Sequence, residues 1–190
     1  MLDKLSRYYF NEGLKKAKDG MISSALCDLK KSIDYCPNNM EAWKLAGLCF
    51  YRLGRLAAAE RCWAVCLQSG GTDADAEGYI KDVRVLEEKV EPLMAEVYMC
   101  SSKKKYGKAA SVFSKKVLPV LNSQADAFSF LGILRMLSGC KRKASREWRN
   151  ALLLDASSVP AVRYLASLEH DGRNGVRKRV LNWIAPDKKS

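Results

Sequence analysis

The residues of this chain that could perform chemistry are few and scattered. His170 is the only histidine, and it stands between two acidic residues beside residues 172–175, Gly-Arg-Asn-Gly. That loop is too short, and lacks the preceding strand, to bind phosphate as glycine-rich loops do. Glu87, Glu88 and Glu91 follow helical spacing, which is typical of a solvated helix face rather than of a paired acid and base. The sequence therefore predicts that the protein is not an enzyme.

The seven cysteines do not form a metal-binding pattern. Cys62 and Cys66 are one helical turn apart, but two thiols without further ligands make a poor zinc site. Most cysteines take the place of small residues on predicted helix faces. We therefore expect reduced, buried or half-buried thiols and no cofactor, as is typical of a reducing compartment.

The N-terminal sequence and the hydropathy pattern predict a cytoplasmic location. Asp3, Lys4 and Arg7 interrupt the first residues, so no signal peptide is visible. No apolar stretch approaches the ~20 residues that a membrane-spanning helix needs.

Basic residues are unevenly distributed. Residues 1–95 carry 14 Lys or Arg and 14 Asp or Glu, so the whole net charge of +12 lies in residues 96–190. The predicted basic patch consists of Lys103, Lys104, Lys105, Lys141, Arg142, Lys143, Arg177, Lys178 and Arg179. Such a strip could bind RNA or another polyanion, or could simply keep an apolar array in solution. Because few aromatic residues for base stacking lie among these positions, we expect weak anion binding without sequence preference.

The elements that carry these residues are predicted from residues 42–67. The stretch indicates two amphipathic helices separated by a turn at Gly54. Small and aromatic residues recur on them at helical spacing: Trp43, Ala46, Gly47 and Phe50 on the first, Ala59, Trp63 and Cys66 on the second. Small residues let two helices approach closely, and aromatic residues fill the space that is left. The same pattern recurs 34 residues earlier at Gly13, Gly20 and Ala25, and later at Gly132, Gly139, Ala144 and Trp148.

This pattern resembles the tetratricopeptide repeat (TPR), whose fingerprint is Trp, Leu-Gly and Tyr, then a spaced Ala, Phe and Pro. Two departures are that Ala46 replaces the Leu and that residues 70–71, Gly-Gly, replace the closing Pro. The resemblance covers roughly residues 5–171. It implies an all-α fold, a right-handed TPR-like solenoid of about ten helices, whose role is to bind other macromolecules.

The recurrences divide residues 1–171 into repeats near 6–38, 40–71, 91–123 and 125–157, with a partial repeat at 159–171. An extra helical segment is expected at 72–90. An apolar stripe runs through Pro92 without changing phase, which predicts one long helix near 75–102 with a kink at the proline. Residues 172–190 are expected to form a C-terminal capping helix and tail, or alternatively a detachable amphipathic helix for a membrane surface or a partner.

In TPR proteins the first helix of each repeat lines a concave groove, so the resemblance places a partner site there. The corresponding residues are unusually apolar and aromatic: Phe10, Leu45, Leu48, Tyr51, Arg52, Tyr98, Phe130, Ile133, Met136 and Tyr164. The leading prediction is a scaffold or adaptor that binds an apolar or amphipathic segment of a partner protein in this groove. Some of these residues could instead pack on the long helix or the cap, or support self-association. The Lys, Asn and Arg clamp with which some TPR proteins bind chaperone C-termini is not present at the matching positions.

Overall fold

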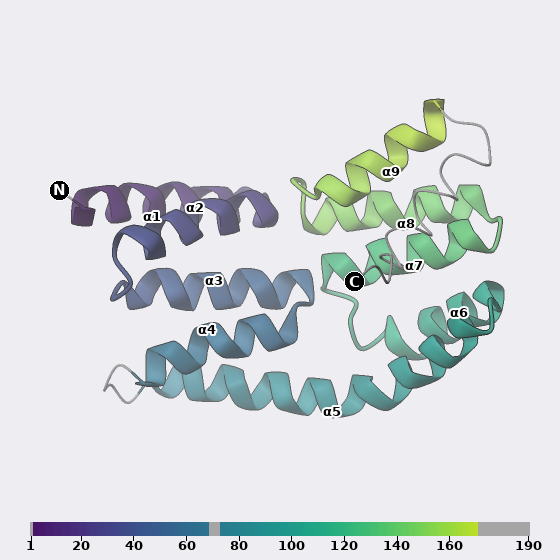
Figure 1. The fold of residues 1–190 in the computed structure, drawn as a ribbon, viewed down its shortest axis with the longest axis horizontal. Helices are drawn as coiled ribbons and strands as arrows, with labels where there is room; N and C mark the ends of the chain where they lie inside the picture. Colours follow the sequence, from purple (N-terminus) through teal and green to yellow (C-terminus); the bar gives the residue numbers. More distant parts are fainter. Residues whose placement is uncertain (1, 69–72, 171–190) are drawn as a thin grey trace, which may run out of the picture.

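The computed structural model describes residues 2–68 and 73–170 of the chain, and Figure 1 shows their arrangement. Within these residues the structure contains helices and no strand. The elements are α1 (Leu2–Lys18), α2 (Ile22–Tyr35), α3 (Met40–Leu53), α4 (Leu56–Gln68), α5 (Ala74–Ser102), α6 (Tyr106–Val112), the π-helical turn η1 (Phe113–Val117), α7 (Ala125–Leu137), α8 (Lys141–Leu154) and α9 (Val159–His170). The predicted all-α solenoid is confirmed. The helix predicted within residues 172–190 lies outside the described residues.

Turns between paired helices are made by residues in the left-handed backbone region. Gly20, Gly54 and Gly139 have φ of 77°, 92° and 85°, which glycine adopts without steric cost. The corresponding turn between α5 and α6 has Lys104 instead, with φ of 56°. Gly20, Gly54 and Gly139 are therefore the points at which the chain reverses direction between paired helices.

Two helix pairs are joined by the same contact between a glycine and a tryptophan. Gly47 of α3 faces the indole of Trp63 on α4, and Trp63 Nε1 donates a hydrogen bond to a backbone carbonyl of α3 at 3.2 Å. Gly132 of α7 faces Trp148 of α8 in the same way, again with a hydrogen bond of 3.2 Å. Both tryptophans are at most 1% exposed. In these two helix pairs the glycine and the tryptophan thus form one interlocked pair.

The long helix predicted before and after Pro92 is confirmed as α5, which is 29 residues long. Its buried residues, among them Val83, Val90 and Val97, follow one stripe, whereas Pro92 is exposed. A proline on the exposed side removes a backbone hydrogen bond that water can replace. The helix therefore continues past the proline, and it bends along its length (Figure 1).

The repeats form two stacks that lie side by side (Figure 1). We call α1–α4 with the first half of α5 the N-terminal stack, and the second half of α5 with α6–α9 the C-terminal stack. Each helix packs mainly on its neighbours in sequence, and α3 also contacts α7. Because α5 belongs to both stacks, the chain runs toward it in one stack and away from it in the other. The array is thus folded back on itself.

Candidate interaction surfaces

The ten predicted groove residues do not line one continuous groove. Ile133 and Met136 are 2% and 3% exposed, and they belong to the core formed with Trp148 and Ala161. The physical reason is that α7 is apolar on most sides and is covered by its neighbours in the C-terminal stack. The prediction that these two residues line an open surface is wrong.

The remaining groove residues are distributed over separate regions of the structure. Phe10 and Leu45 pack against the core of α1–α3, and Leu48 and Tyr51 against the core around Trp63. Arg52 is exposed near the end of α3, and Tyr164 of α9 stacks on Trp148 with ring centroids 5.0 Å apart. Tyr98 and Phe130 do come together, with ring centroids 6.4 Å apart, and Tyr98 is 57% exposed. A partner contact at these exposed or half-buried residues stays a prediction.

The boundary between the two stacks, which we call the seam, is held by a buried carboxylate. Asp155, at the end of α8, is 1% exposed. Its side chain accepts hydrogen bonds from the Ser23 backbone N–H at 3.1 Å and from Ser23 Oγ at 2.5 Å. It also accepts from Ser157 N at 3.1 Å and Ser157 Oγ at 2.7 Å, and Ser157 Oγ in turn accepts from Ser24 N at 3.0 Å. The α8–α9 turn therefore binds the first turn of α2.

A second seam contact joins the α3–α4 turn to the start of α7. Arg55 Nε donates to Asp126 Oδ2 at 2.9 Å. Beside this pair, Ala125 is 1% exposed and packs into the core of α1–α3, and Gln124 lies against Gly54. Each stack thus contributes its turns to the seam.

An open apolar cavity of about 570 Å³ lies on the N-terminal stack beside the seam, and we call it the seam groove. Most of its lining is apolar: Leu26, Cys27 and Ile33 of α2, Trp43, Ala46 and Phe50 of α3, Cys62 of α4, and Val159 and Pro160 of α9. Sequence reasoning missed this site because the predicted groove used only the first helix of each repeat, whereas the seam groove also includes α2 and α4, the second helices of their repeats. In addition, Val159 lies beside α2 only because the array folds back on itself. The spacing of Leu26, Cys27, Lys30 and Ile33 on one side of α2 is the signal that could have indicated it.

Of the two cysteines that line the seam groove, the buried Cys62 is suited to packing rather than to reaction. Burial raises the pKa of Cys62 to about 11, so its thiol is protonated at neutral pH. The exposed polar residues of the groove are Lys30, Asp34 and Arg55. The groove is therefore an apolar surface with charges at its rim.

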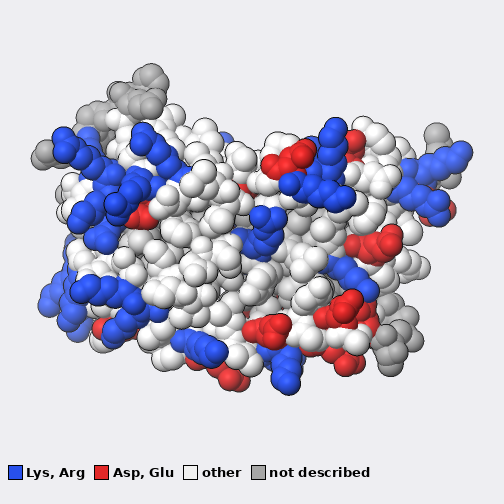
Figure 2. Space-filling model, turned by 180° about the vertical axis from the view of Figure 1, so that it is seen from behind, with Lys and Arg blue, Asp and Glu red and all other residues white. Residues whose placement is uncertain are grey.

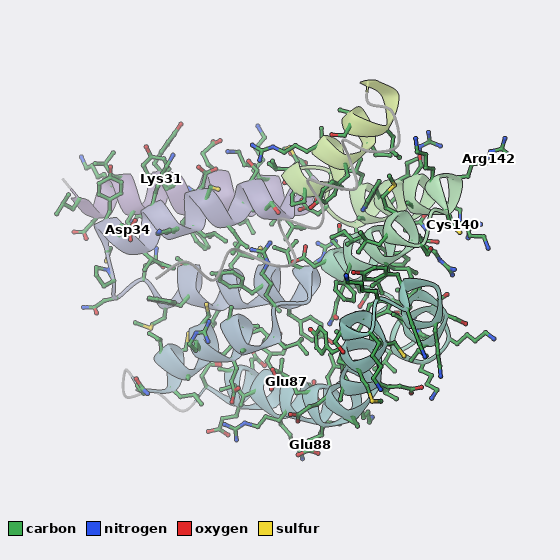
Figure 3. All side chains as sticks on the ribbon, turned by 45° about the vertical axis from the view of Figure 1, so that its right-hand side comes forward. Lys31, Asp34, Glu87, Glu88, Cys140 and Arg142 are labelled. Carbon is green, nitrogen blue, oxygen red and sulfur yellow. The ribbon has the colours of Figure 1, made fainter. Side chains whose placement is uncertain are left out.

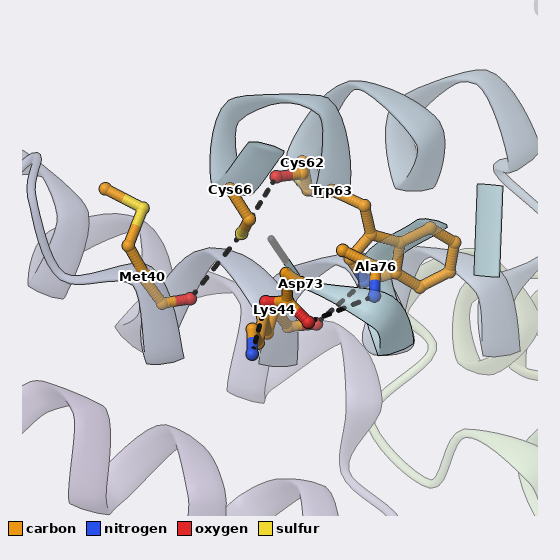
Figure 4. Close-up of polar contacts among 7 residues, drawn as sticks. All are labelled: Met40, Lys44, Cys62, Trp63, Cys66, Asp73 and Ala76. Atoms are coloured by element: carbon orange, nitrogen blue, oxygen red, sulfur yellow. Dashed lines mark hydrogen bonds and ion pairs between the residues drawn. The ribbon is translucent and has the colours of Figure 1, made fainter. Parts of the chain in front are cut away.

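A polar cluster near the start of α5 has a structural role (Figure 4). The carboxylate of Asp73 caps α5 by accepting from Ala76 N at 3.2 Å and forms an ion pair with Lys44 of α3. Their hydrogen bond raises the pKa of Lys44 and lowers that of Asp73. Cys66 Sγ donates to backbone carbonyls at Met40 and Cys62. Because these polar groups have partners, the cluster fixes α3, α4 and α5 relative to one another. Among the described residues, no three His, Cys, Asp or Glu side chains gather closely enough to hold a metal ion.

Much of the predicted basic patch gathers where α5 meets α6 and α7 meets α8. We call this region the basic end and define it as Lys103, Lys104, Lys105, Lys108, Lys141, Arg142 and Lys143. A methyl group built on Gly107 would lie 4.0 Å from the Cβ of Ser138, so the two turns are adjacent. Figure 2 shows this end at its left, where Lys and Arg predominate. In Figure 3, Cys140 and Arg142 stand at the tip of this end, whereas Glu87 and Glu88 of α5 lie well away from it. Arg177, Lys178 and Arg179 of the predicted patch lie outside the described part of the chain.

None of the helices within residues 2–68 and 73–170 combines the length and apolar character needed to cross a bilayer.

Neither a protein-family model nor a curated protein sequence matches this chain. Solved structures do match it. The TPR domain of P58(IPK) is 15% identical with a TM-score of 0.50, and the match covers 97% of this chain and 57% of that one. MamA matches with 17% identity over 95% of this chain and 88% of that one, at a TM-score of 0.41. YrrB, described as a TPR protein with an unusual peptide-binding site, matches with 17% identity. That match covers 82% of this chain and 89% of YrrB, at a TM-score of 0.39. On the similarity to P58(IPK), together with the helix pairs and their glycine turns, this chain has the tetratricopeptide-repeat fold.

Proposed function

We propose that this protein is an interaction scaffold that binds an apolar segment of a partner protein in the seam groove. The observation that carries the proposal is the groove itself, an open apolar cavity of about 570 Å³. Its volume lies within the range of about 300–1,000 Å³ that is usual for ligand sites.

The shape of the seam groove favours a short helix or an extended segment as the ligand. Leu26 and Ile33 lie two turns apart along one wall, and Trp43, Ala46 and Phe50 follow helical spacing along α3. Apolar side chains at positions i, i+3 or i+4, and i+7 of a partner helix would lie between these rows. Burial of such side chains is the main source of affinity at an interface of this kind.

The rim charges would orient the partner. Lys30 and Asp34 are one turn apart on α2 and are exposed, so a partner with charges of both signs beside its apolar face would pair with them. Exposed charges contribute more to selection among partners than to affinity. Arg55 is already engaged by Asp126, and we assign it to the wall rather than to recognition.

The test is affinity capture from a native lysate followed by mass spectrometry, and then titration of the partner that is identified. Leu26→Ala with Ile33→Ala should weaken binding of that partner by about 1–3 kcal/mol. The matched control is Leu153→Ala with Val162→Ala, which removes apolar side chains that are 84% and 50% exposed elsewhere on the surface. Unchanged binding by the groove variant, or an equal loss in the control, would contradict the proposal.

The same assay tests the residues first expected to form the groove. Tyr51→Ala with Phe130→Ala should leave binding in the seam groove unchanged, because neither side chain lines it. A larger loss of partner binding in this variant than in Leu26→Ala with Ile33→Ala would show that the partner binds at α3, α5 and α7 instead.

A further inference from the structure

We infer that the basic end, together with the exposed residues Tyr98 and Met99, is a second interaction surface that binds an acidic polypeptide segment containing apolar side chains. This surface lies apart from the seam groove, because α8 separates them. Lys141 begins that helix and the Asp155 contact follows its end, and a helix of 14 residues is about 21 Å long. The inference therefore does not depend on the function proposed above.

The first observation is that the positive charges of the basic end are unpaired. None of its seven residues forms an ion pair with a described residue, and all but the half-buried Lys141 are exposed. Adjacent turns bring the two groups of charges together, so their potentials add.

The second observation is that the carboxylates of residues 96–168 are engaged elsewhere. Within residues 96–168, Glu96 pairs with Lys116, Asp126 with Arg55, and Glu147 with Arg146. Asp155 accepts the hydrogen bonds of the seam. Residues 96–168 therefore provide no free carboxylate to neutralise the basic end, and an external anion would.

The third observation selects the class of anion. Tyr98 and Met99, which are 57% and 54% exposed, lie on the last turns of α5 directly before Lys103. Lys103 is the C-cap of α5 and follows Met99 by four residues, about one helical turn, so the apolar and the charged side chains are close together in the chain. A segment with both carboxylates and apolar side chains satisfies such a surface, whereas a phosphate backbone satisfies only its charges.

The composition of the basic end also disfavours base recognition. Six of its seven residues are lysines, which act as point charges, and Arg142 alone offers the planar fork that pairs with base edges. The nearby Tyr106 is half-buried and packs against the core. The surface thus lacks the set of stacking platforms that single-stranded RNA binding uses.

The test uses fluorescence anisotropy with three labelled probes of equal net charge. They are a peptide that alternates pairs of Glu with Leu or Phe, a poly-Glu peptide, and a single-stranded RNA of mixed sequence. At near-physiological salt the acidic apolar peptide should bind about tenfold more tightly than either other probe. Tighter binding of the RNA, or equal binding of both peptides, would overturn the inference.

Two charge-reversal variants locate the surface. Replacement of Lys103, Lys104 and Lys105 by Glu should weaken binding of the acidic apolar peptide at least about tenfold. Replacement of Lys141, Arg142 and Lys143 by Glu should do the same, and it is expected to fold well because acidic residues are favourable in the first turn of a helix. The control replaces Lys4, Lys15 and Lys18, which are exposed on α1, by Glu. It therefore changes the net charge by the same amount as each test variant, but at another place on the surface. A loss in the control as large as in the test variants would show attraction by net charge alone and would overturn the inference.

The apolar contribution is tested separately. Tyr98→Ala with Met99→Ala should weaken binding of the acidic apolar peptide about fivefold and leave binding of poly-Glu unchanged. Only the acidic apolar peptide has apolar side chains to bury against Tyr98 and Met99. An equal effect on both peptides, or none on either, would contradict the role assigned to Tyr98 and Met99.

Discussion

The second repeat, α3 with α4, and the fourth, α7 with α8, have the same interior and different surroundings. In both, a glycine faces a tryptophan whose Nε1 donates a hydrogen bond of 3.2 Å to the preceding helix. Yet α3 borders the open seam groove, whereas α7 is buried along most of its length. The pair α7–α8 also borders the basic end, which has no counterpart on the neutral half of the sequence. The comparison indicates that packing determines the repeat interior, and that the two surfaces can differ without changing it.

The largest expected effect tests whether the two interiors are equivalent. In Gly47→Ala the new methyl group would lie 2.8 Å from Trp63 Cδ1, and in Gly132→Ala 2.6 Å from Trp148 Cδ1. Each substitution should lower the free energy of unfolding by about 3 kcal/mol, because a buried indole cannot move aside easily. Urea denaturation measures this loss.

The control for this prediction is Gly78→Ala on α5, where the new methyl group meets nothing within 4 Å. That substitution should stabilise the protein by about 0.5–1 kcal/mol, because alanine favours helix over glycine. A loss confined to one of Gly47→Ala and Gly132→Ala would show that the two repeats are not packed equivalently.

A smaller effect on stability is expected at the C-terminal ends of α2 and α8. Their C-cap residues have the same backbone conformation and different side chains. Cys36 has φ −144° and ψ 92°, and Asp155 has φ −141° and ψ 93°. Asp155→Ala should destabilise the protein by about 2 kcal/mol, because it leaves the hydrogen-bond donors of Ser23 and Ser157 without their acceptor. Cys36→Ala should change stability by less than about 0.5 kcal/mol in the same thermal or urea measurement. Equal effects would mean that the seam contributes little.

The buried thiols give the N-terminal stack a pH dependence of its own. Burial raises the pKa of Cys49 and of Cys62 from 9.0 to about 11. Between pH 9 and 11 the unfolded chain has lost these protons and the folded chain retains them, so stability is complete below pH 9 and falls as the pH rises. The expected fall is about 1 kcal/mol per pH unit for each thiol, and so about 2 kcal/mol per pH unit for the pair. Cys49→Ala with Cys62→Ala should flatten this dependence, and an unchanged slope would assign it to other groups.

The smallest effect concerns the one turn that departs from glycine. Lys104 has a φ of 56°, where a residue with a side chain is strained, while Gly54 and Gly139 hold the equivalent turns. Lys104→Gly should stabilise the protein by no more than about 1 kcal/mol, because release of strain is partly offset by the greater freedom of glycine in the unfolded chain. A thermal shift assay measures it, with Lys108→Gly, within α6, as a destabilising control.

The sequence predicted the repeat interior well and the surfaces poorly. Gly47 with Trp63, Gly132 with Trp148 and the continuous α5 follow from local spacing, because helix pairs bring residues into contact at fixed offsets. The seam depends on contacts such as that of Ser23 with Asp155, which are 132 positions apart and leave no periodic signal.

The same long-range contacts explain the incorrect part of the site prediction. Ile133 occupies a position that an open array would expose, and its burial among α7, α8 and α9 depends on how the C-terminal helices stack. The basic end could be predicted in part, because its residues are concentrated in two turns. The adjacency of those turns required the structure.

The seam also has a consequence for the order in which the chain folds. Helix pairs form from contacts close in sequence, which is why repeat arrays assemble quickly from any starting point. Closing the seam requires the ends of a very long loop to meet, and this carries an entropic cost that local pairing does not. We therefore expect each stack to acquire its helices first and the two to dock in a later, slower kinetic phase. Stopped-flow refolding would detect that phase, and Asp155→Ala should reduce its amplitude while leaving the fast phase intact.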